Sequence, residues 1–131
     1  EEIGRNMMFF EYQNEIVIID AGLQFPEEET PGIDFIIPNT TYLESKKANI
    51  HALLVTHGHY DHIGAIPYIM NKIGNPPIYT TSLTKAIIEK RQEDFPNRSK
   101  LNIITVKNGE KIKLSNNFEP LDNPFAELKL E

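Results

Sequence analysis

The order of apolar and polar residues along the chain predicts a series of short strands and helices. Residues 7–12 and 15–20 are rich in strand-forming side chains, and Gln13-Asn14 between them suits a tight turn, so we expect a hairpin. A short helix is expected over 41–47. The run "HALLVT" at 51–56 is almost continuously apolar, which indicates a strand buried on both faces of its sheet.

Helical spacing of apolar residues begins after that strand. We expect one helix over 63–73, with Pro67 near its start, where the missing N–H is no loss, and Gly74 as its C-terminal stop. Its inward face would carry apolar residues three or four positions apart, namely Ile66, Ile69, Met70 and Ile73.

A further strand and helix are predicted next. The segment "PIYTT" at 77–81 has the composition of a strand. Ser82 can cap a helix that runs from Leu83 to about Glu93, since Pro96 lies beyond its end. The residues expected to face inward on this helix are Leu83, Ile87 and Ile88.

The last pattern predicts a second hairpin, with strands over 101–106 and 110–114 joined by a turn at Asn108-Gly109. Residues 23–39, which include three prolines and an acidic run, show no periodicity and are predicted to be a loop. Strands and helices alternate in the middle of the chain, and hairpins lie towards both ends. This order indicates an α/β fold with a mixed sheet that helices cover on at least one face.

Composition bounds the class of protein. The chain has 131 residues, of which 40% are hydrophobic and 24% charged, as in an ordinary globular domain. It has no cysteine, which excludes disulfides and thiolate metal sites, and no apolar run near the ~18 residues that span a bilayer. We therefore expect no membrane partner and a cytoplasmic location. Because the sequence begins at Glu1 without a methionine, we expect it to be a piece of a longer protein.

The formal net charge of −6 argues against a module that coats nucleic acids through a broad basic surface. It does not exclude a nuclease that uses bound divalent cations, because such cations would offset part of the negative charge locally.

Three of the four histidines lie in one stretch, "THGHYDHIG", at 56–64. His57 and His59 are two residues apart and can project to the same side of an extended loop, and Asp61 and His62 follow where the chain turns into a helix. Neutral imidazole and carboxylate are zinc ligands. The stretch follows a buried strand, where α/β sheets place their sites, and it has the reach to serve two ions roughly 3.5–4 Å apart.

A structural role is the ordinary alternative for a histidine, and we assign it to His51, which opens a strand. For the four clustered residues it is disfavoured, because three imidazoles and a carboxylate are costly to desolvate together without a cation. A bound cation lowers the pKa of water from 15.7 towards about 7 and polarises the oxygen under attack. We therefore predict a hydrolase that uses metal-activated hydroxide, with Asp61 and His62 as its catalytic residues.

The stretch resembles the hallmark of the metallo-β-lactamase superfamily, H-x-H-x-D-H after a buried strand, which is complete here. The earlier "IIDAG", with Asp20 at a strand end, is similar to the first motif of that superfamily. The resemblance implies an αββα sandwich, of which this chain would hold an N-terminal portion. It also implies that Asp20 supports the metal loop from behind the ligands. The alternative for Asp20 is an aspartate that merely ends a strand.

Three segments narrow the resemblance to the bacterial ribonuclease J family: "EIGRNM" at 2–7, "DAGLQFPEEETPGIDFIIPN" at 20–39 and "THGHYDHIGAIPY" at 56–68. The resemblance runs from Glu2 to about Phe118 and implies a zinc-dependent RNA hydrolase, both a 5′-to-3′ exonuclease and an endonuclease, that acts on messenger and ribosomal RNA. It further implies a homodimeric or homotetrameric parent protein.

The same resemblance implies two zinc ions per complete site, although manganese also suits these donors. One ion would be bound by His57 and His59 and the other by Asp61 and His62. The family takes further ligands from later segments, whereas no histidine follows His62 in this chain.

The domain over 1–131 is therefore expected to be a single, partial one, without the β-CASP domain that helps the family hold RNA. Residues 119–131 diverge from the family pattern, and no metal role is assigned to Asp122 in this tail. We expect little or no nuclease activity from the chain alone.

Two other functions stay open. A small-molecule hydrolase of the same superfamily, such as a thioesterase or lactamase, would use the same ligands, although the "GIDFIIP" loop at 32–38 favours the nuclease. Alternatively, the chain is a non-catalytic fragment that binds one structural metal ion or none. Metal content distinguishes a hydrolase from a non-catalytic fragment, since two zinc ions per chain would argue against the fragment hypothesis.

Overall fold

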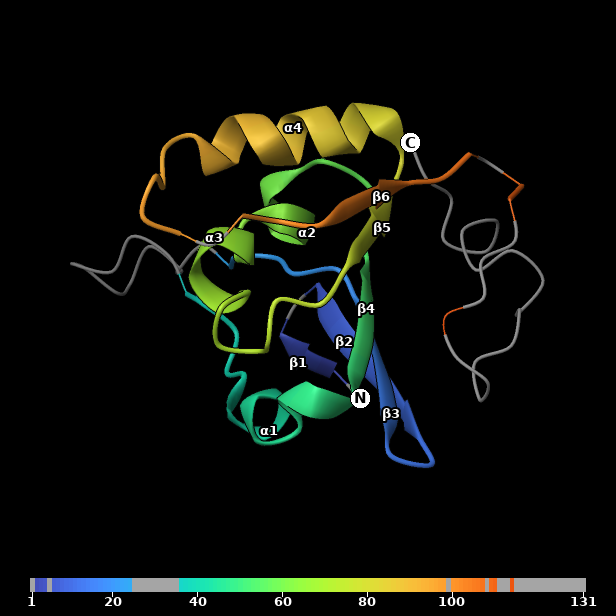
Figure 1. Cartoon of the computed structure of the whole chain (residues 1–131). Coiled ribbons are helices and arrows are strands. Elements are labelled where there is room, and N and C mark those ends of the chain that lie inside the picture. Colours follow the sequence, from blue (N-terminus) through green and yellow to red (C-terminus); the bar gives the residue numbers. More distant parts are fainter. Residues whose placement is uncertain are drawn as a thin grey trace.

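The computed structural model of the chain describes residues 2–4, 6–24, 36–98, 100–107, 109–110 and 114. Its centre is a six-stranded sheet in the order β1-β2-β3-β4-β5-β6 (Figure 1). The strands are β1 (Glu2–Gly4), β2 (Met7–Tyr12), β3 (Glu15–Ile19), β4 (Ile50–Leu54), β5 (Ile78–Thr80) and β6 (Ile103–Thr105). Strands β1 to β3 pair antiparallel and β3 to β6 parallel, so the sheet is mixed, as predicted.

The predicted hairpin and the predicted buried strand are both confirmed. Gln13 and Asn14 have φ values of 49° and 66°, the combination that a two-residue type I′ turn requires. Strand β4 is buried except at His51. The Nε2 atom of His51 lies 3.6 Å from Oε1 of Glu15 on β3, so this histidine pairs at the sheet and not with the histidine-rich stretch.

All helices in the described part of the chain lie on one face of the sheet (Figure 1). They are α1 (Thr41–Ser45), the 3-10 turn η1 (Lys47–Asn49), α2 (Tyr60–Ile63), α3 (Ile66–Ile69) and α4 (Ser82–Gln92). None of them is long and apolar enough to cross a bilayer. One apolar cluster joins this face to the helices, and each large side chain buried in it contributes roughly 1.5–3 kcal/mol. Its fully buried members include Ile18, Leu53, Ile78, Leu43, Ile63, Ile69 and Ile88.

The opposite face of the sheet, which we call the open face, is also apolar. Side chains alternate between the two faces along each strand, and the register shows which residues of β2 to β6 share the open face. Part of this set forms a smaller buried cluster around Val17 and Leu54. Others are exposed, with Met8 at 40% and Ile104 at 38%. The apolar open-face residues are Met8, Phe10, Tyr12, Val17, Ile19, Ala52, Leu54, Tyr79, Ile104 and Val106, and Glu15 lies on the same face opposite Tyr12.

The single helix predicted over 63–73 is wrong in its extent. Two short helices stand in its place, because α2 begins already at Tyr60 and α3 ends at Ile69. The predicted stop at Gly74 is therefore also wrong: Gly74, with a φ of +89°, ends the turns that follow α3. The inward face was predicted correctly, and its buried residues are Ile66, Ile69, Met70 and Ile73.

Hydrogen bonds to a distant segment break that helix. The Ala21 N–H donates to the His62 carbonyl at 2.7 Å, and the Ala65 N–H donates to the Ala21 carbonyl at 2.9 Å instead of back along the helix. Pro67 has no N–H to continue the ladder. The α2–α3 junction is thus set by its contact with Ala21, which local periodicity does not reveal.

Two expectations for α4 are also wrong. The N-cap is Thr81, whose side-chain oxygen accepts from the Thr84 N–H, and Ser82 is already inside the helix. Leu83 and Ile87 were expected inside but are 65% and 39% exposed. The helix instead faces the sheet with Thr84 and Ile88, each one position after an expected residue. The Thr84 hydroxyl can be buried at little cost because it accepts a hydrogen bond from Thr81. The buried residues of α4 are Thr84 and Ile88.

Strand β6 confirms part of the strand predicted over 101–106. Three further predictions fall wholly or partly outside the described residues: the strand over 110–114, the loop over 23–39 and the tail over 119–131. At the ends of that loop, Gln24 and Ile36 form an isolated antiparallel bridge.

Candidate metal centre

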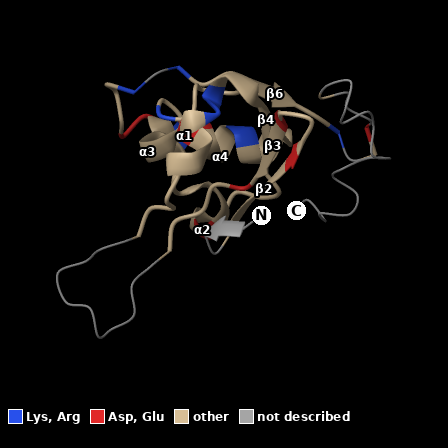
Figure 2. Cartoon of the chain, turned by 90° about the horizontal axis from the view of Figure 1, so that it is seen from below, with Lys and Arg blue, Asp and Glu red and all other residues tan. Residues whose placement is uncertain are grey.

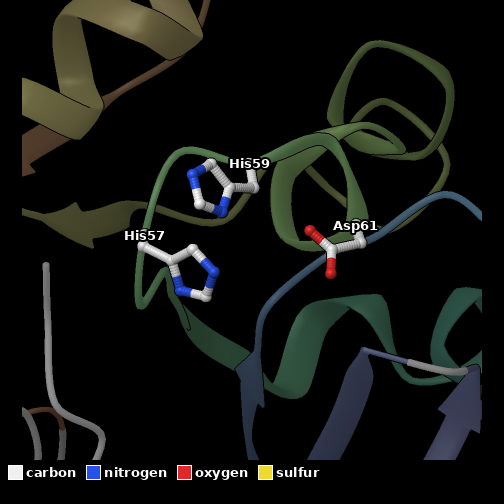
Figure 3. A group of neighbouring side chains, drawn as sticks. All are labelled: His57, His59 and Asp61. Atoms are coloured by element: carbon white, nitrogen blue, oxygen red, sulfur yellow. The ribbon is translucent and has the colours of Figure 1, made fainter.

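The candidate metal centre lies at the carboxyl end of β4, where the chain leaves the sheet and enters α2. His57 and His59 belong to the connecting loop, whereas Asp61 and His62 belong to the short helix itself. Figure 3 shows the two imidazole rings and the Asp61 carboxylate directed towards a common space. The end of β3, the neighbouring parallel strand, brings Asp20 to the same place.

Three of the predicted ligands converge. One donor atom from each of His57, His59 and Asp61 lies within 4.8 Å of the other two. The rings of His57 and His59 meet edge to face, with centroids 4.9 Å apart. Imidazole nitrogen and carboxylate oxygen are the donors that zinc takes at about 2.0–2.2 Å, so small side-chain movements would close this group around a cation. The donor set therefore fits a divalent metal ion.

His62 lies against the same group in a different orientation. Its Nδ1 atom is 2.7 Å from Oδ2 of Asp20, and its Nε2 atom is 3.5 Å from Oδ2 of Asp61. Its ring centroid lies 3.7 Å from that of His57. Because Asp20 engages Nδ1, Nε2 is the nitrogen left to face a cation beside Asp61. The structure thus brings all four residues of the motif together.

Asp20 lies buried behind the histidines, 6% exposed. Its carboxylate accepts from the Thr56 N–H at 2.8 Å and from the Thr56 hydroxyl, also at 2.8 Å. Its φ of 60° lies in the left-handed region, which costs energy for a residue with a side chain. These bonds hold Asp20 in that conformation, and they place its carboxylate where it can orient His62.

Thr56 was missed as a site residue in the sequence analysis. Besides its bonds to Asp20, its hydroxyl lies 3.0 Å from Nδ1 of His57. The signal available was its position directly before His57, at the end of the buried strand. Thr56 thereby links the buried carboxylate to a second histidine of the group.

Residues 20–23, which we call the strap, hold α2 against the end of the sheet. The Leu23 N–H donates to the Tyr60 carbonyl at 3.2 Å. Gly22 lies so close to the helix that a Cβ atom there would be 1.8 Å from the carbonyl oxygen of Asp61. Only glycine allows this approach, so the strap fixes the backbone that carries Asp61.

Burial lowers the pKa of His57 below its ordinary value of 6.5, and the electrostatic effect of the nearby His62 lowers it further. The negative charge of Asp20 acts in the opposite direction with a smaller effect. The imidazole of His57 is therefore neutral at pH 7, which is the form that offers a nitrogen lone pair to a metal ion.

A groove of about 620 Å³ lies between the motif and α4. His59 and Tyr60 line it on one side and Ile87 and Arg91 on the other. Arg91 donates from Nη2 to the Gly64 carbonyl at 3.0 Å, and its guanidinium carbon lies 4.7 Å from the centre of the Tyr60 ring. A hollow of this volume beside the donor group has the size of a small-molecule site.

The fold and the convergent donor residues agree with the family to which the sequence is matched. The family model described as "Metallo-beta-lactamase superfamily" matches residues 2–125, and the chain belongs to this superfamily. Its fold is likewise that of the superfamily, as predicted. Among solved structures, the rubredoxin oxygen:oxidoreductase of Desulfovibrio gigas superposes with a TM-score of 0.55 at 21% identity, covering 82% of this chain and 24% of that one. This likeness concerns the fold alone.

Curated relatives carry the similarity further. The chain is 46% identical over 93 residues to "Ribonuclease J 1" of Streptococcus pyogenes serotype M3, and 38% identical over 117 residues to "Ribonuclease J" of Synechocystis sp.. These matches cover 71% and 89% of this chain but 16% and 18% of the relatives. The predicted resemblance to ribonuclease J is confirmed, and the chain spans less than a fifth of the length of these relatives.

Proposed function

We propose that the chain is part of a metal-dependent RNA hydrolase of the ribonuclease J type, with zinc as the cation and with both 5′-to-3′ exonuclease and endonuclease action. The observation that carries the proposal is the convergence of His57, His59 and Asp61, whose donor atoms lie within 4.8 Å of one another. The names of the similar relatives support RNA as the substrate.

In this proposal, His57, His59, Asp61 and His62 hold the cations. A bound divalent cation supplies the Lewis acidity that makes water an effective nucleophile at neutral pH. Asp61 has a carboxylate that can accept a hydrogen bond from the attacking water and so orient it. Asp20 holds His62 through Nδ1, and the groove beside Tyr60 receives the part of the RNA next to the scissile phosphate.

Recognition of RNA by this part of the protein would be local and not spread over a basic surface. Figure 2 shows both basic and acidic positions among the described elements. Helix α4, for example, carries Lys85, Glu89, Lys90 and Arg91. This distribution fits the net charge of −6 and leaves bound cations as the main attraction for a phosphodiester.

Among the residues that the structure describes, the motif offers three histidines and one aspartate to two cations, which is two donors for each. Cation sites of this kind ordinarily use three or four protein ligands. The chain alone is therefore proposed to hydrolyse RNA slowly or not at all, and a complete site needs donors from outside these residues. The parent is proposed to act in the cytoplasm as a homodimer or homotetramer.

Zinc binding by the full 131-residue chain tests the site without requiring activity. We expect His57→Ala to lose most zinc, as measured by equilibrium dialysis and metal analysis, whereas the matched variant His51→Ala keeps it, because His51 pairs with Glu15. Equal zinc contents in the two variants would exclude the proposed centre.

The substrate class needs a separate comparison. With zinc present, we expect the chain to bind a 5′-monophosphorylated oligoribonucleotide in preference to a thioester or a cephalosporin, as measured by fluorescence anisotropy and competition. A preference for either small molecule would favour the alternative hydrolase of the same superfamily.

A further inference from the structure

We propose that Asn6 is a positioning residue that sets the direction of the Asp61 carboxylate at the cation site. The inference rests on the proposed function, because it takes Asp61 to be a ligand. The Nδ2 atom of Asn6 donates to Oδ2 of Asp61 at 3.2 Å. The two residues are 55 positions apart in sequence, so the contact is made by the fold and not by local chain geometry.

The Asp61 carboxylate needs such a partner because its surroundings constrain it little. Its side chain is 54% exposed, and the Nε2 atom of His62 is 3.5 Å away, too far for a strong hydrogen bond. A half-exposed side chain that must adopt one rotamer before it can bind loses conformational entropy on binding. A hydrogen bond that selects this rotamer in advance reduces that cost.

Asn6 is itself held in place by the strap. Its carbonyl accepts from the Gly22 N–H at 3.2 Å. Gly22 in turn lies against the backbone of Asp61, and a Cβ atom built on it would also lie 3.3 Å from Cβ of Asn6. The turn before β2, the strap and the first turn of α2 are thus packed one on another. The Asn6 amide therefore reaches Asp61 from a fixed backbone.

The chemistry of the pair is directional. An ionised carboxylate only accepts hydrogen bonds, so the amide must present its NH2 group and not its carbonyl oxygen to Asp61. Aspartate at position 6 would keep the shape of the side chain while it replaces the donor with a second carboxylate. Repulsion would then turn Asp61 away. This separates positioning from packing, because a packing role would tolerate the isosteric aspartate better than alanine.

Zinc affinity of the full 131-residue chain, measured by competition with a chromophoric chelator, provides the first test. We expect roughly tenfold weaker binding for Asn6→Ala and a larger loss for Asn6→Asp. Asn71→Asp, which adds the same charge on an exposed turn, should bind zinc as the unaltered chain does. In an Asp61→Ala background, Asn6→Ala should cause no additional loss, because its effect passes through Asp61.

Side-chain NMR couplings of Asp61 in the zinc-free chain provide a second readout. We expect one dominant χ1 rotamer in the unaltered chain and averaging between rotamers in Asn6→Ala, with an unchanged circular dichroism spectrum. If Asp61→Ala weakens zinc binding while both Asn6 variants bind normally and keep one rotamer, the inference is overturned and the proposed function stands. If Asp61→Ala leaves zinc affinity unchanged, the ligand role of Asp61 fails first and the inference fails with it.

Discussion

On one face of the central sheet the helices leave the strand side chains almost fully buried, and Ile18 and Leu53 are both 0% exposed. The open face is also mostly apolar, and Val17 and Leu54 are buried there. Phe10 and Tyr12 on the same face, however, are 52% and 57% exposed. The helical face also carries the contacts that fix the metal centre, through the strap and α2. The comparison teaches that the site depends on the face that the helices cover, whereas the open face leaves apolar side chains exposed next to a buried cluster.

The largest difference between the faces is expected from core truncation. Leu53→Ala on the helical face should lower the free energy of unfolding by about 3 kcal/mol, because it leaves a cavity among fully buried neighbours. Urea denaturation followed by circular dichroism measures this change. A loss below about 1 kcal/mol would mean that the helices do not pack as described.

Zinc should stabilise the helical face selectively. At a free zinc concentration 100 times the dissociation constant, the chain should gain about 2.7 kcal/mol, and a chelator should reverse the gain. Hydrogen exchange should show the added protection at amides of α2 and the strap, more than at amides of β2, which lies farther from the site. Uniform protection, or none, would contradict a site that belongs to one face.

Asp20→Asn should weaken the interaction that orients His62 and should lower the stability of the chain moderately. Asparagine tolerates the left-handed backbone at this position, so the change isolates the loss of negative charge towards His62. We expect about 1 kcal/mol of destabilisation and about tenfold weaker zinc binding. Calorimetric titration measures the affinity, and Asp94→Asn, at an exposed residue after α4, serves as the matched control.

The smallest change in stability is expected on the open face. Phe10→Ser should alter the free energy of unfolding by no more than about 0.5 kcal/mol, because the ring is already half exposed. The same change should reduce self-association, as measured by analytical ultracentrifugation at increasing concentration. A loss of stability similar to that of Leu53→Ala would show that the Phe10 side chain is packed within the chain.

Local signals were enough for the parts of the fold that local chemistry decides. A few consecutive residues are enough to predict three features: the turn at Gln13-Asn14, the buried strand β4 and the four-residue cluster from His57 to His62. The structure places them as a hairpin, a buried strand and a group of converging side chains. In each case the sequence neighbours are also neighbours in space.

The errors arose where a distant segment decides the local structure. The helix over 63–73 is interrupted because Ala21 takes part in its hydrogen bonds. Helix α4 buries Thr84, whose hydroxyl accepts from Thr81, whereas Leu83 and Ile87 were expected to face inward. Asn6 reaches Asp61 across 55 positions, and no pattern within either segment points to the other.

The bond from the Thr56 N–H to Asp20 joins the ends of two parallel strands across 36 positions. A parallel pair cannot form from a short turn, so its loop must close before this bond exists. The motif peptide 56–64 alone would therefore lack its orienting carboxylate and bind metal poorly. During folding, the chain would bind a cation only after β3 and β4 have paired. The rate of metal binding would therefore report on this slow pairing of distant segments.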